Sequence, residues 1–147
     1  MESILVGVDG SKGSQHALEW ALNAARAWGA TVQAVHVAPR MDIPAYVAGR
    51  AGGVPGPTVE VRLAHGEQVL DEVIQAAAPP ADIVLEREVV LAEHPAEALV
   101  ARSRDVDLIV VGSRGVGGFR GVLLGSVSQR CAAHAACPVV VVPPTAD

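Results

Sequence analysis

Residues 107–128 read DLIVVGSRGVGGFRGVLLGSVS, and the rest of the chain can be interpreted outward from them. They begin with an apolar run and continue with a stretch that holds six glycines and two arginines. They end at Gly125 and Ser126, where an alanine-rich segment starts. A short apolar run bounded by glycine is typical of a buried strand. The segment therefore predicts a strand, a glycine-rich loop and a helix, in that order.

Strands and helices alternate in both directions from this segment. Short apolar runs predict strands at 4–8, 31–37, 82–92, 107–113 and 138–142. Apolar residues spaced three and four apart predict helices at 14–28, 66–78, 95–104 and 126–136. The prolines and glycines of residues 39–60 predict a loop. This alternation implies right-handed crossovers and an α/β three-layer sandwich around a five-stranded parallel sheet.

The composition agrees with this architecture. A chain of 147 residues fits one domain, which we expect to span residues 1–147. Half of the residues are hydrophobic, so a disordered chain is excluded. Aromatic residues make up 3% of the chain, which leaves valine, alanine, leucine and isoleucine to fill the interior. Strands rich in such aliphatic residues are typical of parallel sheets that are buried on both faces.

Charge and hydropathy exclude two classes of partner. The formal net charge of −5 argues against binding to the phosphate backbone of DNA or RNA, which requires a basic surface. No apolar run approaches the roughly 18 residues that a membrane span needs. The N-terminus carries an acidic second residue and enters a strand at once, unlike a signal peptide. We therefore expect a soluble cytoplasmic protein.

The two cysteines form a C-x-x-H-x-x-C array with a histidine, through Cys131, His134 and Cys137. A structural zinc site usually has four ligands in two close pairs, whereas this array offers three on one short segment. We expect two small buried hydrophobic side chains and a histidine on the surface of a helix. A disulfide between the cysteines is not expected in a reducing compartment.

The glycine-rich loop follows a strand at the end where parallel α/β proteins bind ligands. Glycines let backbone N–H groups turn inward, and the first turn of a helix offers free N–H donors to an anion. Ser126 and Ser128 can add hydroxyl groups, and Arg114 and Arg120 can add positive charge. The residues are equally compatible with a tight turn, an N-cap at Ser126 and two solvated arginines. Both interpretations remain open at this level.

Other nucleotide motifs and one hydrolase motif are absent. The chain has no G-x-x-x-x-G-K-[ST] loop. A G-x-G-x-x-G pattern starts at Gly115 and Gly117, but Arg120 stands where its third glycine belongs. No G-x-S-x-G nucleophile elbow occurs either.

The glycine spacing resembles the signature of the universal stress protein family, which is G-x-x-G, nine residues, then G-[ST]. Gly112 and Gly115 precede the nine residues 116–124, and Gly125 and Ser126 close the pattern. The resemblance spans nearly the whole chain, through the segments ILVGVDGS, VQAVHV, HPAEALV and HAACPVVVV. It is strongest to the branch of the family that binds ATP, and it implies the adenine nucleotide alpha hydrolase-like fold.

The resemblance also implies a set of ligand contacts. Asp9 would lie near the ribose or near a Mg²⁺ ion bound to the phosphates, and Val37 would meet the adenine through its backbone. The residues along the ribose and phosphates would be Gly112, Ser113, Arg114 and Gly115. The residues that hold the phosphates at the helix start would be Gly125, Ser126, Val127 and Ser128. From the sequence alone, Asp9 has an alternative role in an Asx-turn or as an N-cap.

The family resemblance implies a homodimer in which the strand Pro138–Val142 pairs with its copy in a second subunit. A bare hydrophobic final strand is prone to such pairing unless it is covered. One departure from the family is visible, because Glu93 stands where a glycine often precedes the proline of the third helix. The departure concerns the local turn before Pro95 and leaves the expected ATP contacts unchanged.

No histidine or carboxylate has a position that indicates catalysis. We expect His16 on the first helix, His65 in a loop, His36 among the alternating residues of a strand, and His94 as a capping residue. Together with this observation, the family resemblance implies an ATP-binding regulatory stress-response protein that acts as a nucleotide-dependent dimer, with at most slow ATP hydrolysis. The alternatives are a nucleotide-free interaction scaffold of the same fold and a nucleotidyl-transfer enzyme. The chain lacks the HIGH, KMSKS and SGG-x-D-S patterns of the latter.

Overall fold

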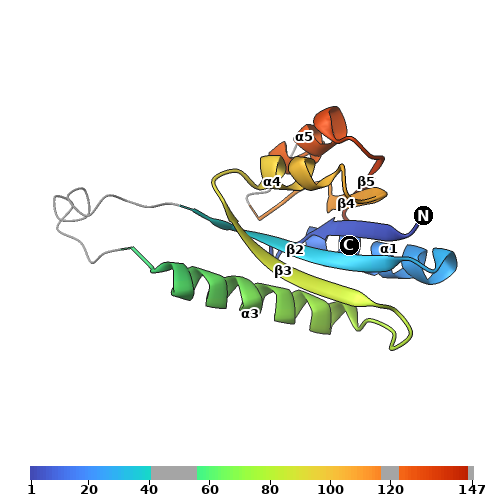
Figure 1. Cartoon of the computed structure of the whole chain (residues 1–147), viewed down its shortest axis with the longest axis horizontal. Helices are drawn as coiled ribbons and strands as arrows, with labels where there is room; N and C mark the ends of the chain where they lie inside the picture. The colour runs from blue at the N-terminus through green and yellow to red at the C-terminus, as the bar shows by residue number, and fades with distance from the viewer. Residues whose placement is uncertain (41–55, 117–122, 146–147) are drawn as a thin grey trace.

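The computed structural model describes residues 1–40, 56–116 and 123–145. Strands and helices alternate along them, as Figure 1 shows. In chain order they are β1 (Ser3–Gly7), α1 (Lys12–Trp28), β2 (Thr31–Pro39), α3 (Val59–Ala77), β3 (Leu85–Ala92), α4 (Pro95–Arg102), β4 (Leu108–Gly112), α5 (Ser126–His134) and β5 (Val139–Val142). None of these helices is both long and apolar enough to cross a membrane.

The five strands form one parallel sheet in the order β3-β2-β1-β4-β5. The chain moves from β1 outward through β2 to β3, and then crosses back to place β4 on the other side of β1. The strand order therefore reverses between β1 and β4. Parallel α/β sheets bind ligands beyond the carboxyl ends of the strands at such a point.

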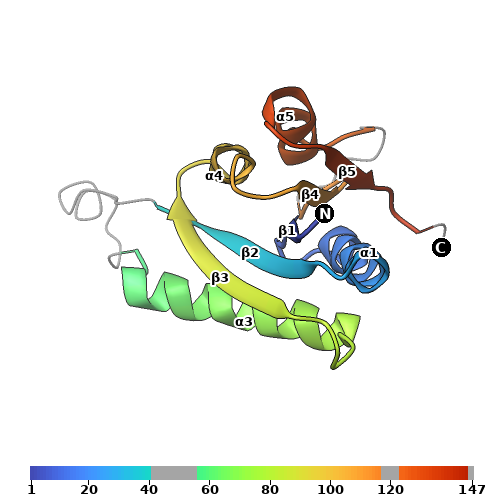
Figure 2. The ribbon, with the colours of Figure 1, turned by 45° about the vertical axis from the view of Figure 1, so that its right-hand side comes forward.

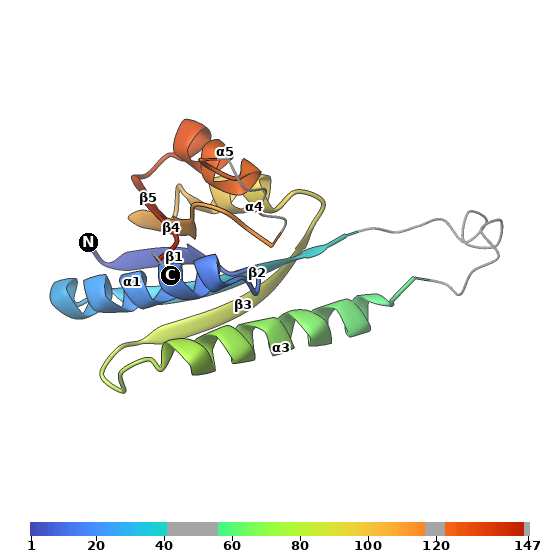
Figure 3. The same ribbon diagram turned by 180° about the vertical axis from the view of Figure 1, so that it is seen from behind.

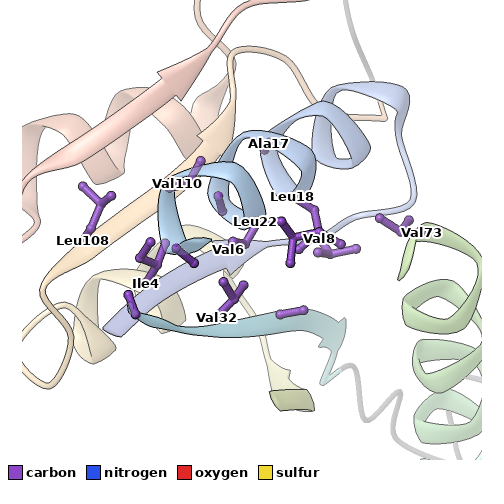
Figure 4. Close-up of a cluster of buried hydrophobic side chains, with 14 of the residues drawn as sticks. Ile4, Val6, Val8, Ala17, Leu18, Leu22, Val32, Val73, Leu108 and Val110 are labelled. Atoms are coloured by element: carbon purple, nitrogen blue, oxygen red, sulfur yellow. The ribbon is translucent and has the colours of Figure 1, made fainter. Parts of the chain in front are cut away.

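Helices cover both faces of the sheet, which confirms the predicted three-layer α/β fold. Helices α1 and α3 lie on one face, and α4 and α5 lie on the other (Figures 2 and 3). Each face has its own apolar cluster. Figure 4 shows the first cluster, in which Leu18 and Leu22 of α1 point toward Val6 and Val8. Leu5, Leu99 and Cys131 belong to the second cluster.

Helix α1 begins and ends at residues suited to those positions. Ser11 is its N-cap, and the Ser11 hydroxyl accepts a hydrogen bond from the Ser14 amide at 3.1 Å. The helix stops at Gly29, whose φ of 69° lies in the left-handed region that glycine adopts without strain. The stop at Gly29 brings β2 directly back alongside β1.

Helix α3 is longer than the sequence pattern predicts. We expected a loop over residues 39–60 and a helix from 66, but the helix begins at Val59 behind an N-cap at Thr58. Residues 41–55 of that predicted loop lie outside the described residues. Val59 and Val61 are exposed, so the first turns bury little and give no clear apolar stripe. His65 consequently lies in a helix, and its predicted place in a loop is wrong. The other boundaries agree with the prediction to within three residues.

Replacing Gly66 by alanine is expected to destabilise the protein, although alanine favours a helix by about 1 kcal/mol over glycine. The new Cβ would lie 2.6 Å from Val89 Cγ1 and 3.0 Å from His36 Cδ2. Val89 is β-branched and stiff, so α3 must move away from the sheet. Such overpacking costs about 1–3 kcal/mol, and we expect a net loss of about 1 kcal/mol. Chemical denaturation measures the change.

Gly56→Ala is the matched control for this prediction, because a Cβ at Gly56 meets nothing within 4 Å. We expect its free energy of unfolding to be no lower than that of the parent. A Gly66→Ala variant as stable as its parent would show that α3 does not depend on close contact with β2 and β3.

Candidate nucleotide site

A cavity of about 630 Å³ lies at the carboxyl ends of β1 and β4, where the strand order reverses. Its size is within the range of small-molecule sites. The ten residues for which the resemblance implies ligand contacts all line it: Asp9, Val37, Gly112, Ser113, Arg114, Gly115, Gly125, Ser126, Val127 and Ser128. The structure therefore brings all ten together, while their contacts with a ligand stay predictions. Arg120, which we expected to add charge, lies outside the described residues.

The two ends of the glycine-rich segment are tied to each other and to the last strand. The Gly125 amide donates to the Ser113 carbonyl at 2.6 Å, so the start of α5 returns to the end of β4. The Ser113 amide donates to the Val142 carbonyl at 2.9 Å. The cavity wall is thus continuous with β5 through hydrogen bonds of the backbone.

The buried hydroxyl of Ser128 adds a further tie between α5 and β4. Its Oγ lies 3.0 Å from the Ser113 carbonyl oxygen and 3.0 Å from that of Gly125, so its single hydrogen is shared between these two acceptors. The resemblance implied that Ser128 holds the phosphates. In this arrangement its hydroxyl orients the first turn of α5 against the end of β4.

Several backbone N–H groups in the cavity wall have no protein acceptor among the described residues. The N-cap of α5 is Gly125, which carries no capping side chain, and the alternative N-cap at Ser126 is therefore wrong. This leaves the first three amides of the helix, 126–128, without acceptors in the described part of the chain. The amides of Arg114 and Gly115 also have no acceptor among the described residues. Unpaired amides at the start of a helix and in a turn can form an anion-binding site.

Asp9 joins the end of β1 to the glycine-rich segment. Its Oδ1 accepts hydrogen bonds from the Ser11 amide at 2.9 Å and the Ser11 hydroxyl at 2.5 Å, so it forms the Asx-turn that the sequence left open. Its Oδ2 accepts from the Val116 amide at 3.2 Å. A carboxylate has about four lone-pair sites, and these contacts occupy three. One site on Oδ2 remains for a cation, and the donor set therefore fits a Mg²⁺ ion that other ligands also hold.

The part of the cavity lining that comes from β2 and α4 is apolar. Val35 and Val37 come from β2, and Pro95 and Leu99 come from α4. The sequence analysis placed Pro95 only at the start of a helix, because its approach to the site depends on how α4 packs across the sheet. Glu93, where the chain departs from the family pattern, is exposed and does not line the cavity.

The histidines lie at the edge of the site or away from it. His16 lies on α1, as predicted. His94 occupies the N-cap position of α4 but makes no capping hydrogen bond, so its predicted capping role is wrong. His36 lies in β2 beside the cavity, and its Nδ1 is 2.7 Å from the Val8 carbonyl oxygen.

The C-x-x-H-x-x-C array is split between the core and the surface. Cys131 is fully buried, Cys137 is half-buried and His134 is exposed, as the sequence analysis expected for Cys131 and His134. Burial raises the pKa of the Cys131 thiol to about 11, and burial also raises the pKa of Cys137. Both thiols are therefore protonated near neutral pH and act as apolar side chains.

Comparison with known sequences identifies one family. The sequence model of the universal stress protein family matches residues 1–143. A universal stress protein of Mycobacterium tuberculosis is 36% identical over 138 residues, which cover 94% of this chain and 44% of that protein. The chain thus spans about half the length of the curated relatives that it matches first.

Solved structures of the same family share the fold. A universal stress protein from Lactobacillus plantarum superposes with a TM-score of 0.77 at 25% identity, over 96% of this chain and 97% of that one. A universal stress protein in complex with cAMP superposes with a TM-score of 0.69 at 24% identity, over 96% of each chain.

Proposed function

The chain belongs to the universal stress protein family, and on that basis we propose that it binds ATP in the cavity at the carboxyl ends of β1 and β4. The cAMP complex of a protein with the same fold supports the choice of an adenine nucleotide. The glycine pattern of residues 112–126 supports ATP within that class, because it resembles that of the ATP-binding branch.

One observation supports this proposal most strongly. Arg114, Gly115 and the residues at the start of α5 line the same cavity, and their amides have no acceptor in the described part of the chain. Together they suit the three phosphates, whose negative charge also favours the N-terminal end of a helix. The apolar residues that β2 and α4 contribute to the lining suit the base. The nucleotide would therefore extend from Val37 to α5.

Magnesium would be held between the phosphates and the free lone pair of Asp9 Oδ2. When bound, the ion neutralises part of the phosphate charge. Asp9 would also keep the glycine-rich segment in place through its bond to the Val116 amide.

The same arrangement supports a regulatory role over a catalytic one. Asp9 is the one carboxylate in the described lining, and three of its lone pairs already accept hydrogen bonds from the protein. No histidine belongs to that lining. Fast hydrolysis requires a group that orients the attacking water. We therefore propose at most slow ATP hydrolysis. We also propose that the protein acts in the cytoplasm.

We further propose a homodimer through the free edge of β5. The other edge strand, β3, carries the charged run Glu86, Arg87 and Glu88, which discourages pairing between sheets. Strand β5 consists of four valines, all of them half-exposed, and it pairs with β4 alone among the described strands. The hydrogen bond from Ser113 to Val142 links the cavity wall to this edge, so a bound nucleotide can influence dimer formation.

Calorimetric titration of the purified chain with Mg-ATP tests the proposal. We expect saturable binding of one ATP per chain, a rise in melting temperature with ATP, and a dimer whose stability in sedimentation depends on ATP. No heat and no thermal shift at millimolar ATP would favour the nucleotide-free scaffold. Rapid, saturable turnover of labelled ATP would favour an enzyme such as a nucleotidyl transferase instead.

A further inference from the structure

Successive residues of β2 direct their backbone N–H and C=O groups alternately toward β1 and toward β3. The Thr31 amide donates to the Glu2 carbonyl at 2.9 Å, and the Val35 carbonyl accepts from the Val8 amide at 2.8 Å. Odd-numbered residues of β2 therefore direct both backbone groups toward β1. The next odd-numbered residue is Val37, which lines the cavity.

A regular ladder would continue with the Val37 amide donating to the Val8 carbonyl. In the structure that carbonyl oxygen lies 2.7 Å from His36 Nδ1 instead. Because a carbonyl oxygen can only accept, Nδ1 carries the hydrogen and donates it. The N–H and C=O groups of Val37 consequently have no partner among the described residues.

The imidazole of His36 is held in this position by its surroundings. Helix α3 approaches so closely at Gly66 that a Cβ there would lie 3.0 Å from His36 Cδ2. Val8 is 3% exposed, so its carbonyl needs a partner inside the protein. His36 supplies that partner with its side chain.

We propose that His36 is a positioning residue that makes the site selective for adenine over guanine. By satisfying the Val8 carbonyl, it leaves the Val37 N–H free to donate to adenine N1 and the Val37 C=O free to accept from the adenine amino group. Guanine carries a hydrogen on N1 and an oxygen in place of that amino group, so it would oppose donor to donor and acceptor to acceptor. This inference rests on the proposed binding of an adenine nucleotide.

Two variants of His36 separate its hydrogen bond from its bulk. Leucine fills similar space without a donor, whereas the Nδ2 of asparagine occupies nearly the position of the imidazole Nδ1. We expect His36→Leu to bind ATP about tenfold more weakly and to lose most of the preference for ATP over GTP. Its affinity for inorganic tripolyphosphate should equal that of the parent. His36→Asn should keep the preference of the parent.

Calorimetry with ATP, GTP and tripolyphosphate measures these ratios. A His36→Leu variant that retains the full ATP-to-GTP ratio would overturn the positioning role. So would a His36→Asn variant that loses the ratio as fully as His36→Leu, because that result would assign the effect to the shape of the ring.

Amide hydrogen exchange of the nucleotide-free parent tests the same inference without any ligand. We expect the Val37 amide to exchange much faster than the Val35 amide, which lies within the ladder. Equal protection of the two amides would overturn the inference, even in a protein that binds ATP. If the parent binds no ATP but Val37 exchanges rapidly, the proposed function fails, whereas the unpaired state of the Val37 amide is supported.

Discussion

The Gly125→Asp variant is expected to bind Mg-ATP at least about 100-fold more weakly than the parent while remaining fully folded. Gly125 is the N-cap of α5, and its φ of −73° and ψ of 171° are accessible to any residue. Aspartate is among the best N-cap residues, because its carboxylate accepts from the free amides of the first turn. Those amides are the groups that we expect to bind the phosphates. The negative charge of the aspartate also repels the phosphates. Titration calorimetry measures the loss.

The Gly125→Ala variant is the matched control. Its Cβ would lie 3.4 Å from the Ser113 carbonyl oxygen and 3.7 Å from the Gly115 amide nitrogen, so the fold accommodates it. The methyl group partly covers the Gly115 amide, and we expect about tenfold weaker binding. Because alanine is a poor N-cap, this variant should be about 1 kcal/mol less stable than Gly125→Asp. Aspartate thus raises stability and lowers affinity relative to alanine. Equal ATP affinity of Gly125→Asp and the parent would show that α5 does not hold the phosphates.

The elements that the sequence predicted well are those whose apolar residues face the sheet. Strands β1 and β4 are nearly continuous apolar runs because both of their faces are covered. Helix α1 shows a clear apolar stripe because one of its sides packs over the sheet. The first turns of α3 lack such a stripe, since Val59 and Val61 are exposed. Periodicity could not reveal a helical segment that buries so little.

The residues of the candidate site also divide into those that the sequence predicted and those that it did not. Glycine spacing and strand ends were enough to assign Gly112, Gly115 and Gly125 to one region, because the chain itself brings these positions to one edge of the sheet. Pro95 begins α4, and its distance from that region depends on how this helix packs on the sheet. Sequence spacing carries no information on such contacts.

Hydrogen-bond partners were the least accessible to prediction. The hydroxyl of Ser128 looked available to donate to phosphate, but in the fold its one hydrogen is shared between the carbonyl oxygens of Ser113 and Gly125. The imidazole of His36 looked like an ordinary polar group of a strand, but it replaces a ladder hydrogen bond at Val8. In both cases the partner is a backbone carbonyl, and the sequence does not record where the carbonyls point.

The second large effect is expected from Asp9, through two variants that remove different parts of its role. Asp9→Ala removes all three hydrogen bonds, those from the Ser11 amide, the Ser11 hydroxyl and the Val116 amide. We expect it to be about 1–3 kcal/mol less stable than the parent and to bind ATP at least about tenfold more weakly. Asp9→Asn can keep its oxygen toward Ser11, but its amino group then faces the Val116 amide, donor to donor. This variant should retain most of the stability and still lose the connection to the glycine-rich segment.

Magnesium distinguishes the cation-binding role of Asp9 from its structural one. We expect ATP affinity of the parent to rise on addition of Mg²⁺, and that of Asp9→Asn to respond much less, because an amide oxygen is a weaker ligand for Mg²⁺ than a carboxylate. Calorimetric titrations with ATP in Mg²⁺ and in EDTA measure the difference. If Asp9→Asn binds ATP weakly yet keeps the full response to Mg²⁺, Asp9 acts only by holding the loop through Val116. If it binds ATP and responds to Mg²⁺ as the parent does, neither role is correct, because the variant lacks both the carboxylate charge and the acceptor for that amide.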